Sequence, residues 1–144
     1  RDRYIFWQRA DVLFASVHVD PRLSAPYYAG HADEIGEGPG KGLTHNFPLP
    51  WGSADPAWLE AIGQALARAR AFEPGALVVS LGFDAAEHDP VATFKITGVG
   101  FEAAARKIAE LRLPTLLVQE GGYLSPHLGS YLGGFMRSFE RGPS

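Results

Sequence analysis

The sequence predicts an α/β domain in which helices cover a parallel β-sheet. Three short apolar runs rich in strand-forming residues are separated by longer segments with helical periodicity. Such alternation of strands and helices is typical of parallel sheets with right-handed crossovers. The runs are apolar on both faces, which predicts strands that are buried on both sides. These predicted strands span residues 12–19, 76–82 and 115–119.

Three helices are predicted between and after these strands. The first begins at Asp55-Pro56, because Asp is a favourable N-cap and Pro suits the first helical turn. Thr97 is the predicted cap of the second helix, and Ser125-Pro126 begins the third. Proline or glycine after the first two helices ends them. The predicted helices span residues 55–73, 97–113 and 125–141.

A long connection, residues 20–52, follows the first predicted strand. It contains many glycines and prolines, and a loop of this length in a compact domain is usually functional or disordered. Its aromatic residues argue against disorder. They are Tyr27, Tyr28, Phe47 and Trp51.

Composition excludes several classes of protein and site. With 13 basic and 16 acidic residues the net charge is -3, which disfavours binding to nucleic acid. The absence of cysteine rules out disulfides and Cys-ligated zinc, so any metal requires His, Asp or Glu. No apolar run approaches the length of a membrane span, and the first residues do not resemble a signal peptide. We therefore expect a cytoplasmic protein with no membrane or nucleic-acid partner.

Three segments follow the carboxyl ends of the predicted strands, where ligands bind in open α/β sheets. They are the long loop after residue 19, the turn that contains Asp84 and the turn that contains Tyr123. Topology alone therefore predicts one crevice that receives Asp84, Tyr123 and either Tyr27 or Tyr28.

Both turn residues have two interpretations. A buried carboxylate at Asp84 needs a partner or a metal, but an Asp at this position can equally be a helix N-cap or an Asx turn. Tyr123 follows Gly121 and Gly122, which allow the backbone to approach another surface closely. Its hydroxyl can donate a hydrogen bond to an oxyanion, or the ring can be a core aromatic with its hydroxyl at the rim.

His18 and Asp20 have a spacing that permits metal binding, because residues two apart on a strand share a face. However, His18 is near the end of an apolar strand and Asp20 precedes Pro21. A structural role for the pair is therefore the favoured interpretation.

Several motifs together resemble the histone deacetylase and acetylpolyamine amidohydrolase family. Residues 79–85 (VSLGFDA), Asp89-Pro90 and residues 94–97 (FKIT) are similar to the segment that carries the family's second metal aspartate, in the form typical of the acetylpolyamine branch. Residues 120–123 (EGGY) resemble the family's glycine-rich tyrosine turn. The long loop also matches, over residues 33–38 (DEIGEG) and 46–50 (NFPLP), and the resemblance covers residues 3–140.

The resemblance implies an arginase-like three-layer α/β fold and zinc-dependent hydrolysis of an acetyl amide on lysine or a polyamine. Asp84 matches a zinc ligand, and Tyr123 matches the catalytic tyrosine that polarises the acetyl carbonyl. A homodimer is also implied, because acetylpolyamine amidohydrolases tend to pair. The implied substrate-binding residues are Tyr27, Tyr28, Gly121 and Gly122.

Structural potassium ions are a further implication of the resemblance. Ser16 and Val17 match positions of one potassium site. Phe6, Arg9 and Val12 match backbone carbonyl donors of a second.

One departure from the family pattern concerns the remaining catalytic groups. The family's other two zinc ligands, an Asp-x-His pair, and its paired histidines fall upstream of Arg1. We therefore expect residues 1–144 to be a single, partial domain, the C-terminal part of a deacetylase catalytic domain, and to be inactive alone. The alternative is a non-catalytic fragment or degenerate homologue that serves as an interaction or structural module.

Overall fold

The computed structural model describes residues 2–24 and 27–142, which form an α/β structure. The predicted fold class is therefore confirmed. The strands are β1 (Phe14–Val19), β2 (Thr44–Leu49), β3 (Leu77–Leu81) and β4 (Thr115–Gln119). The helices are α1 (Asp2–Ile5), the short 3-10 helix η1 (Gly38–Gly40), α2 (Asp55–Phe72), α3 (Gly98–Ala109) and α4 (Leu128–Arg141).

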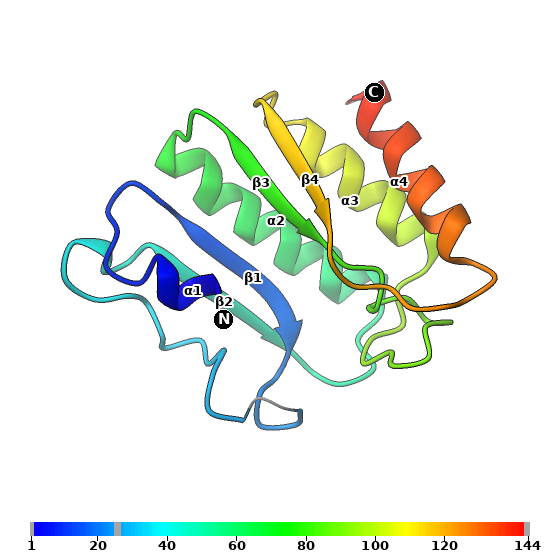
Figure 1. Cartoon of the computed structure of the whole chain (residues 1–144), viewed down its shortest axis with the longest axis horizontal. Helices are drawn as coiled ribbons and strands as arrows, with labels where there is room; N and C mark the ends of the chain where they lie inside the picture. Colours follow the sequence, from blue (N-terminus) through cyan, green and yellow to red (C-terminus); the bar gives the residue numbers. More distant parts are fainter. Residues whose placement is uncertain (1, 25–26, 143–144) are drawn as a thin grey trace.

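The four strands form two parallel pairs. β1 pairs with β2, with Phe14 opposite Thr44, and β3 pairs with β4, with Leu77 opposite Thr115. All four point toward the same end of the molecule, so their carboxyl ends lie on one side (Figure 1). Within the described residues no backbone pairing joins β1 to β3, so the single continuous sheet expected from the sequence is instead two strand pairs.

β2 lies inside the segment that the sequence analysis interpreted as a loop, so that interpretation was wrong for residues 44–49. The strand begins with three polar residues and contains Pro48, a combination that obscures a strand pattern. Proline is tolerated because β2 has a partner on one side, β1, among the described strands. The side chains of Thr44 and Asn46 are both buried. This strand therefore places polar groups in the interior, where a typical strand pattern has apolar residues.

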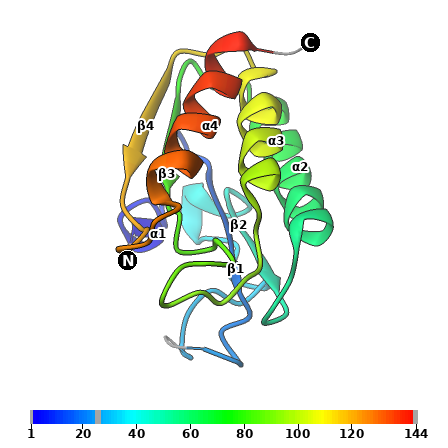
Figure 2. The ribbon, with the colours of Figure 1, turned by 90° about the vertical axis from the view of Figure 1, so that its right-hand side faces the viewer.

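Helices α2, α3 and α4 cover one side of the strands, and α1 lies on the other side (Figure 2). The apolar core forms between the three long helices and the strands, and aromatic rings fill its centre. The Phe83 and Phe101 ring centroids are 5.0 Å apart. Its buried members are Leu81, Phe83, Ala86, Phe94, Ile96, Phe101, Ala105, Ile108, Tyr131 and Phe135. None of the described helices is long and apolar enough to cross a membrane.

The opposite side of β3 and β4 is exposed, although these strands are apolar on both faces. Val78 is 65% exposed, Leu116 60% and Val118 37%. The alternate residues Leu77, Val79, Leu81 and Leu117 pack into the core and are partly or fully buried. Packing against the helices therefore accounts for the apolar residues on one face of this strand pair. No described element covers the other face.

The predicted cap of α3 is confirmed, whereas Asp55 has a different role from the one predicted. Thr97 Oγ1 accepts a hydrogen bond from the Gly100 backbone at 3.2 Å. The Asp55 carboxylate does not cap its own helix but accepts hydrogen bonds from the Thr97 backbone N–H at 2.9 Å and from the Thr97 hydroxyl at 2.5 Å. Asp55 therefore links the N-termini of α2 and α3.

Candidate functional site

The loops that follow β3 and β4 meet at the carboxyl end of this strand pair. The Glu120 N–H donates to the Leu81 carbonyl at 3.2 Å, and the Phe83 N–H donates to the Gly121 carbonyl at 3.1 Å. These bonds extend the parallel pairing beyond the last strand residues. As a result, the turn with Asp84 and the turn with Tyr123 lie against each other, as the topology predicts.

Asp84 packs against glycine backbone. A Cβ atom placed on Gly121 would lie 2.5 Å from Asp84 Oδ1, and one on Gly82 would lie 2.7 Å from the same oxygen. The half-buried carboxylate makes no hydrogen bond or ion pair with any described residue. The alternatives of an N-cap or an Asx turn are therefore not supported, and the oxygens of Asp84 are available to a cation.

The described residues do not complete a metal centre by themselves. No group of three His, Asp or Glu side chains within residues 2–24 and 27–142 is arranged to hold a metal ion. Zinc in a catalytic site normally has three protein ligands and one open position. The described residues therefore offer Asp84 as a single candidate ligand and do not form a complete zinc site.

Tyr123 is 53% exposed, so it is not the core aromatic of the alternative interpretation. The preceding Gly122 has a φ of 111°, and a Cβ atom there would lie 2.9 Å from the Phe83 side chain and 3.0 Å from Leu128. Glycine is thus required both for the backbone conformation and for the close packing. Gly121 and Gly122 bring the tyrosine turn against the aspartate loop, which is the close backbone approach expected of them from the sequence.

Asp89 is a site residue that sequence reasoning missed. Its buried carboxylate accepts the Val91 N–H through Oδ1 at 2.9 Å and the Tyr123 N–H through Oδ2 at 2.8 Å. The Asp-Pro pair in the sequence is typical of a turn, and the contact with Val91 is such a turn contact. The bond to Tyr123 spans 34 positions in the sequence, so no local pattern indicates it.

His18 has a structural role, as expected. Its Nδ1 lies 2.9 Å from the Ser16 hydroxyl and its Nε2 lies 2.8 Å from the Gly30 carbonyl. A carbonyl can only accept, so Nε2 carries the proton and Nδ1 accepts from the hydroxyl. The ring therefore anchors the long loop to β1.

Asp20 is held by Arg22. The Arg22 Nη2 atom lies 2.5 Å from Asp20 Oδ2. Hydrogen bonds from the Arg22 side chain and backbone lower the pKa of Asp20 to about 2. The carboxylate thus stays ionised and paired at neutral pH.

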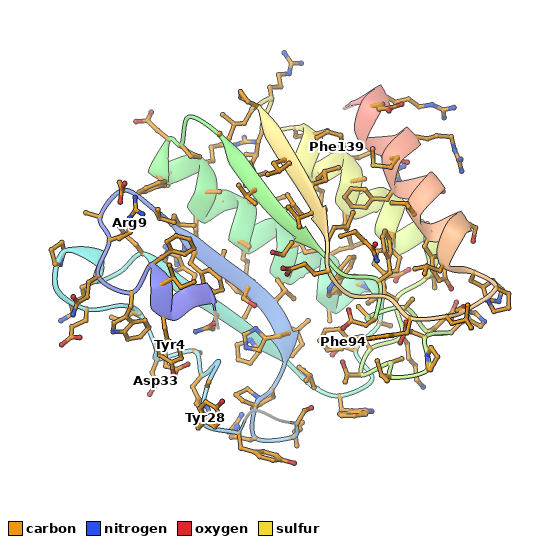
Figure 3. All side chains as sticks on the ribbon, viewed as in Figure 1. Tyr4, Arg9, Tyr28, Asp33, Phe94 and Phe139 are labelled. Atoms are coloured by element: carbon orange, nitrogen blue, oxygen red, sulfur yellow. The ribbon has the colours of Figure 1, made fainter. Side chains whose placement is uncertain are left out.

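Tyr27 and Tyr28 lie apart from the two joined turns. They are 67% and 78% exposed, and Tyr28 is on the loop that follows β1 (Figure 3). No hydrogen bond or ring contact joins either tyrosine to Asp84 or Tyr123 in the described part of the chain. The described contacts therefore join the turns of Asp84 and Tyr123, while the part of the two tyrosines in the crevice stays a prediction.

The positions expected to bind potassium lie in and before β1. Ser16 and Val17 are strand residues, and the Ser16 hydroxyl is already bonded to His18. The Phe6 carbonyl accepts the Arg9 N–H at 3.0 Å, and the Arg9 guanidinium binds Asp11, with Nε 2.8 Å from Oδ1. Val12 lies in the connection between α1 and β1. Among these residues, the printed bonds join Phe6 to Arg9, and potassium binding at them stays a prediction.

Known proteins resemble this chain in sequence. Residues 3–138 match the Histone deacetylase domain family. Acetylpolyamine amidohydrolase 1 of Pseudomonas aeruginosa is 46% identical over 125 residues, which cover 87% of this chain and 36% of that protein. The acetylpolyamine amidohydrolase of Mycoplana ramosa is 44% identical, with 87% and 37% covered. The chain thus spans well under half of the length of these relatives.

Solved structures agree with this assignment. An acetylpolyamine aminohydrolase from Burkholderia pseudomallei superposes with a TM-score of 0.94 at 42% identity, over 99% of this chain and 42% of that one. A histone deacetylase homologue from Aquifex aeolicus gives 0.89 at 28% identity, over 96% and 38%. The expected arginase/deacetylase-like fold and the likeness to the acetylpolyamine branch are confirmed. The chain belongs to the histone deacetylase family.

Proposed function

We propose that this chain is the part of a zinc-dependent acetyl-amide hydrolase that carries one metal ligand and the catalytic tyrosine. The observation that carries the proposal is the pairing of two turns, one with the unpartnered carboxylate of Asp84 and the other with the exposed ring of Tyr123. The relatives named as acetylpolyamine amidohydrolases support hydrolysis of an acetyl amide.

Asp84 would supply one carboxylate ligand to zinc. Its position against Gly121 and Gly82 limits the movement of the side chain, and its lack of a cationic neighbour leaves the negative charge for the metal. Bound zinc would polarise the acetyl carbonyl and lower the pKa of a bound water. The remaining ligands, and the base that takes a proton from water, would come from residues outside the described set.

Tyr123 would donate its hydroxyl hydrogen to the oxygen of the acetyl group as negative charge develops there. A donor that is fixed before the reaction stabilises the oxyanion more than it stabilises the substrate, which speeds the chemical step. The ring is exposed, and the backbone that leads into Tyr123 is held at Gly122 and by Asp89, so the side chain can reach a substrate from a fixed base.

An acetylated polyamine is the substrate class that we favour over acetyl-lysine. The relatives at 44–46% identity are named acetylpolyamine amidohydrolases, and the net charge of -3 suits a cationic substrate. The rings of Tyr27 and Tyr28 would line the substrate passage. The proposal also includes potassium bound near Ser16 and near Phe6. It further includes assembly as a homodimer and a cytoplasmic location.

A chimera tests the proposal in a complete catalytic domain. Residues 3–138 replace the matching segment of the Pseudomonas aeruginosa acetylpolyamine amidohydrolase 1, and bound zinc and acetate release from an acetylated diamine are measured. We expect stoichiometric zinc and turnover, and loss of both after Asp84→Asn. A folded chimera that binds no zinc, or an Asp84→Asn variant that keeps zinc and turnover, would contradict the proposed role of Asp84.

The non-catalytic module is the second candidate for the 144-residue chain taken alone. It is favoured by the lack of a three-ligand group among the described residues and by the exposed apolar side of β3 and β4. Zinc content and acetate release of the isolated chain decide between the candidates. We expect neither zinc nor turnover from the isolated chain, and stoichiometric zinc with turnover would exclude the module.

A further inference from the structure

We propose that Asp89 is the positioning residue that holds the backbone of Tyr123 in place. The inference deepens the proposed function and rests on it for its catalytic meaning, because Tyr123 is the residue positioned. The Oδ2 atom of Asp89 accepts the Tyr123 N–H at 2.8 Å, across 34 positions of sequence. A side chain of the β3 loop thus reaches the backbone of the β4 loop at the residue that carries the hydroxyl.

The carboxylate of Asp89 is itself held in one orientation. Its Oδ1 atom accepts the Val91 N–H at 2.9 Å, and its own N–H donates to the Ala86 carbonyl at 3.0 Å. The residue is 8% exposed, so water does not compete freely for its oxygens. Each oxygen therefore has one backbone donor, and rotation of the carboxylate would break both bonds.

The bond to Asp89 supplies a restraint that the neighbouring contacts do not. The Phe83 N–H bonds to the Gly121 carbonyl at 3.1 Å and so fixes the start of the tyrosine turn. Gly122 follows with a φ of 111°, a conformation that few residues other than glycine adopt. A glycine backbone also moves easily to other conformations. The hydrogen bond to Tyr123 comes directly after this flexible point and fixes the turn on its far side.

The charge on Asp89 strengthens the restraint. Hydrogen bonds to ionised acceptors are about twice as strong as neutral ones, and burial increases the difference. Asparagine has nearly the same shape but presents one acceptor oxygen and one NH2 group. It can accept from Val91 or from Tyr123, but not from both, because its NH2 group then faces the other N–H.

Amide hydrogen exchange and 15N–1H NMR spectra of the full 144-residue chain test the contact without any need for catalysis. In Asp89→Ala we expect the Tyr123 amide to exchange about 10- to 100-fold faster, the effect of losing a hydrogen bond to a charged group. Its proton resonance should also move upfield. Asp89→Asn should give an intermediate result, while the amides of α3 and α4 keep their rates.

Glu87→Ala is the matched control, because Glu87 lies in the same loop and its carboxylate makes no bond to Tyr123. We expect it to leave the Tyr123 amide unchanged. An unchanged Tyr123 amide in Asp89→Ala, in a chain that keeps the α3 and α4 signals, would overturn the inference. So would a Glu87→Ala effect of equal size. If Asp89→Ala does not fold, Asp89→Leu carries the same decision, because leucine is close to aspartate in shape and has no acceptor oxygen.

Activity of the chimera tests the catalytic meaning separately. We expect Asp89→Ala to lower kcat about 10- to 100-fold with little change in KM, and Asp89→Asn to lower it less. If Tyr123→Phe lowers kcat but neither Asp89 variant does, the positioning role is wrong and the proposed function stands. If Tyr123→Phe itself has no effect, the proposed function fails, and the amide exchange still decides the contact between Asp89 and Tyr123.

Discussion

The Asp84 carboxylate lies so close to the backbone of Gly121 that a methyl group on Gly121 would come within 2.5 Å of Asp84 Oδ1. Van der Waals contact requires a wider separation, so Asp84 and any side chain at position 121 cannot both keep their places. The glycine turn before Tyr123 therefore sets the position of the proposed metal ligand as well as that of the tyrosine.

Gly121→Ala should displace Asp84. We expect the chimera to lose about 10- to 100-fold in zinc affinity, the usual effect of disturbing the surroundings of a ligand, and about 1–2 kcal/mol in stability from overpacking. Zinc titration and urea unfolding measure the two quantities. Gly63→Ala in α2 is the control, because no atom lies within 4 Å of a Cβ atom there. It should bind zinc normally and gain about 0.5–1 kcal/mol.

Tyr123→Phe removes the proposed oxyanion donor and little else. The ring is 53% exposed and the backbone bond to Asp89 does not involve the hydroxyl, so the unfolding midpoint should not change. In the chimera we expect kcat for an acetylated diamine to fall about 10²- to 10³-fold, as for other single oxyanion donors. Steady-state kinetics provide the measurement, and a variant with the parent kcat would show that the hydroxyl takes no part.

The ion pair between Asp20 and Arg22 should make the stability of the long loop depend on pH. The folded pKa of Asp20, about 2, lies below the value of about 3.9 for an unfolded chain. The stabilisation is therefore present above the unfolded pKa and is lost as the pH falls toward 2. Arg22→Ala should return the pKa of Asp20 toward its ordinary value, which carboxyl-carbon NMR titration can follow. A titration midpoint that does not move would show that another group lowers the pKa.

The exposed apolar side of β3 and β4 should make the isolated chain associate. Val78 and Leu116 are each at least 60% exposed and lie opposite each other across the pair. Apolar strand surfaces of this kind favour aggregation. We expect Val78→Lys with Leu116→Lys to lower the apparent mass in light scattering. Val99→Lys, at an exposed position on α3, should not. A monodisperse parent chain would contradict this expectation.

The sequence was sufficient to predict the parts of the fold that follow from local pattern. β4 was predicted over its full range, and β1 and β3 to within two residues at each end. The meeting of the Asp84 and Tyr123 turns was predicted because each turn follows a strand, and neighbouring parallel strands bring their carboxyl ends together. The Thr97 cap was likewise a local signal.

Other features depend on contacts between distant segments and had no local signal. β2 was missed because a polar strand with Pro48 becomes recognisable only through its pairing with β1. Asp89 was noted only as part of a motif that resembles the family, because its bond to Tyr123 is set by the packing of two loops. Asp55 resembled a cap of its own helix, and the structure shows that it binds Thr97 instead.

The division of the strands into two pairs affects how the molecule transmits a disturbance from one half to the other. In the described chain, the two halves are joined by isolated backbone hydrogen bonds, such as the one from the Lys95 N–H to the Ser53 carbonyl at 2.9 Å. They are also joined by side chains of the β1–β2 half that pack against the core, among them Val19 and Leu49. A sheet would carry such a disturbance along a ladder of hydrogen bonds. Here no such ladder joins the two described strand pairs, so the β1–β2 half and the turns of Asp84 and Tyr123 are linked only through loop bridges and through side chains packed in the shared core.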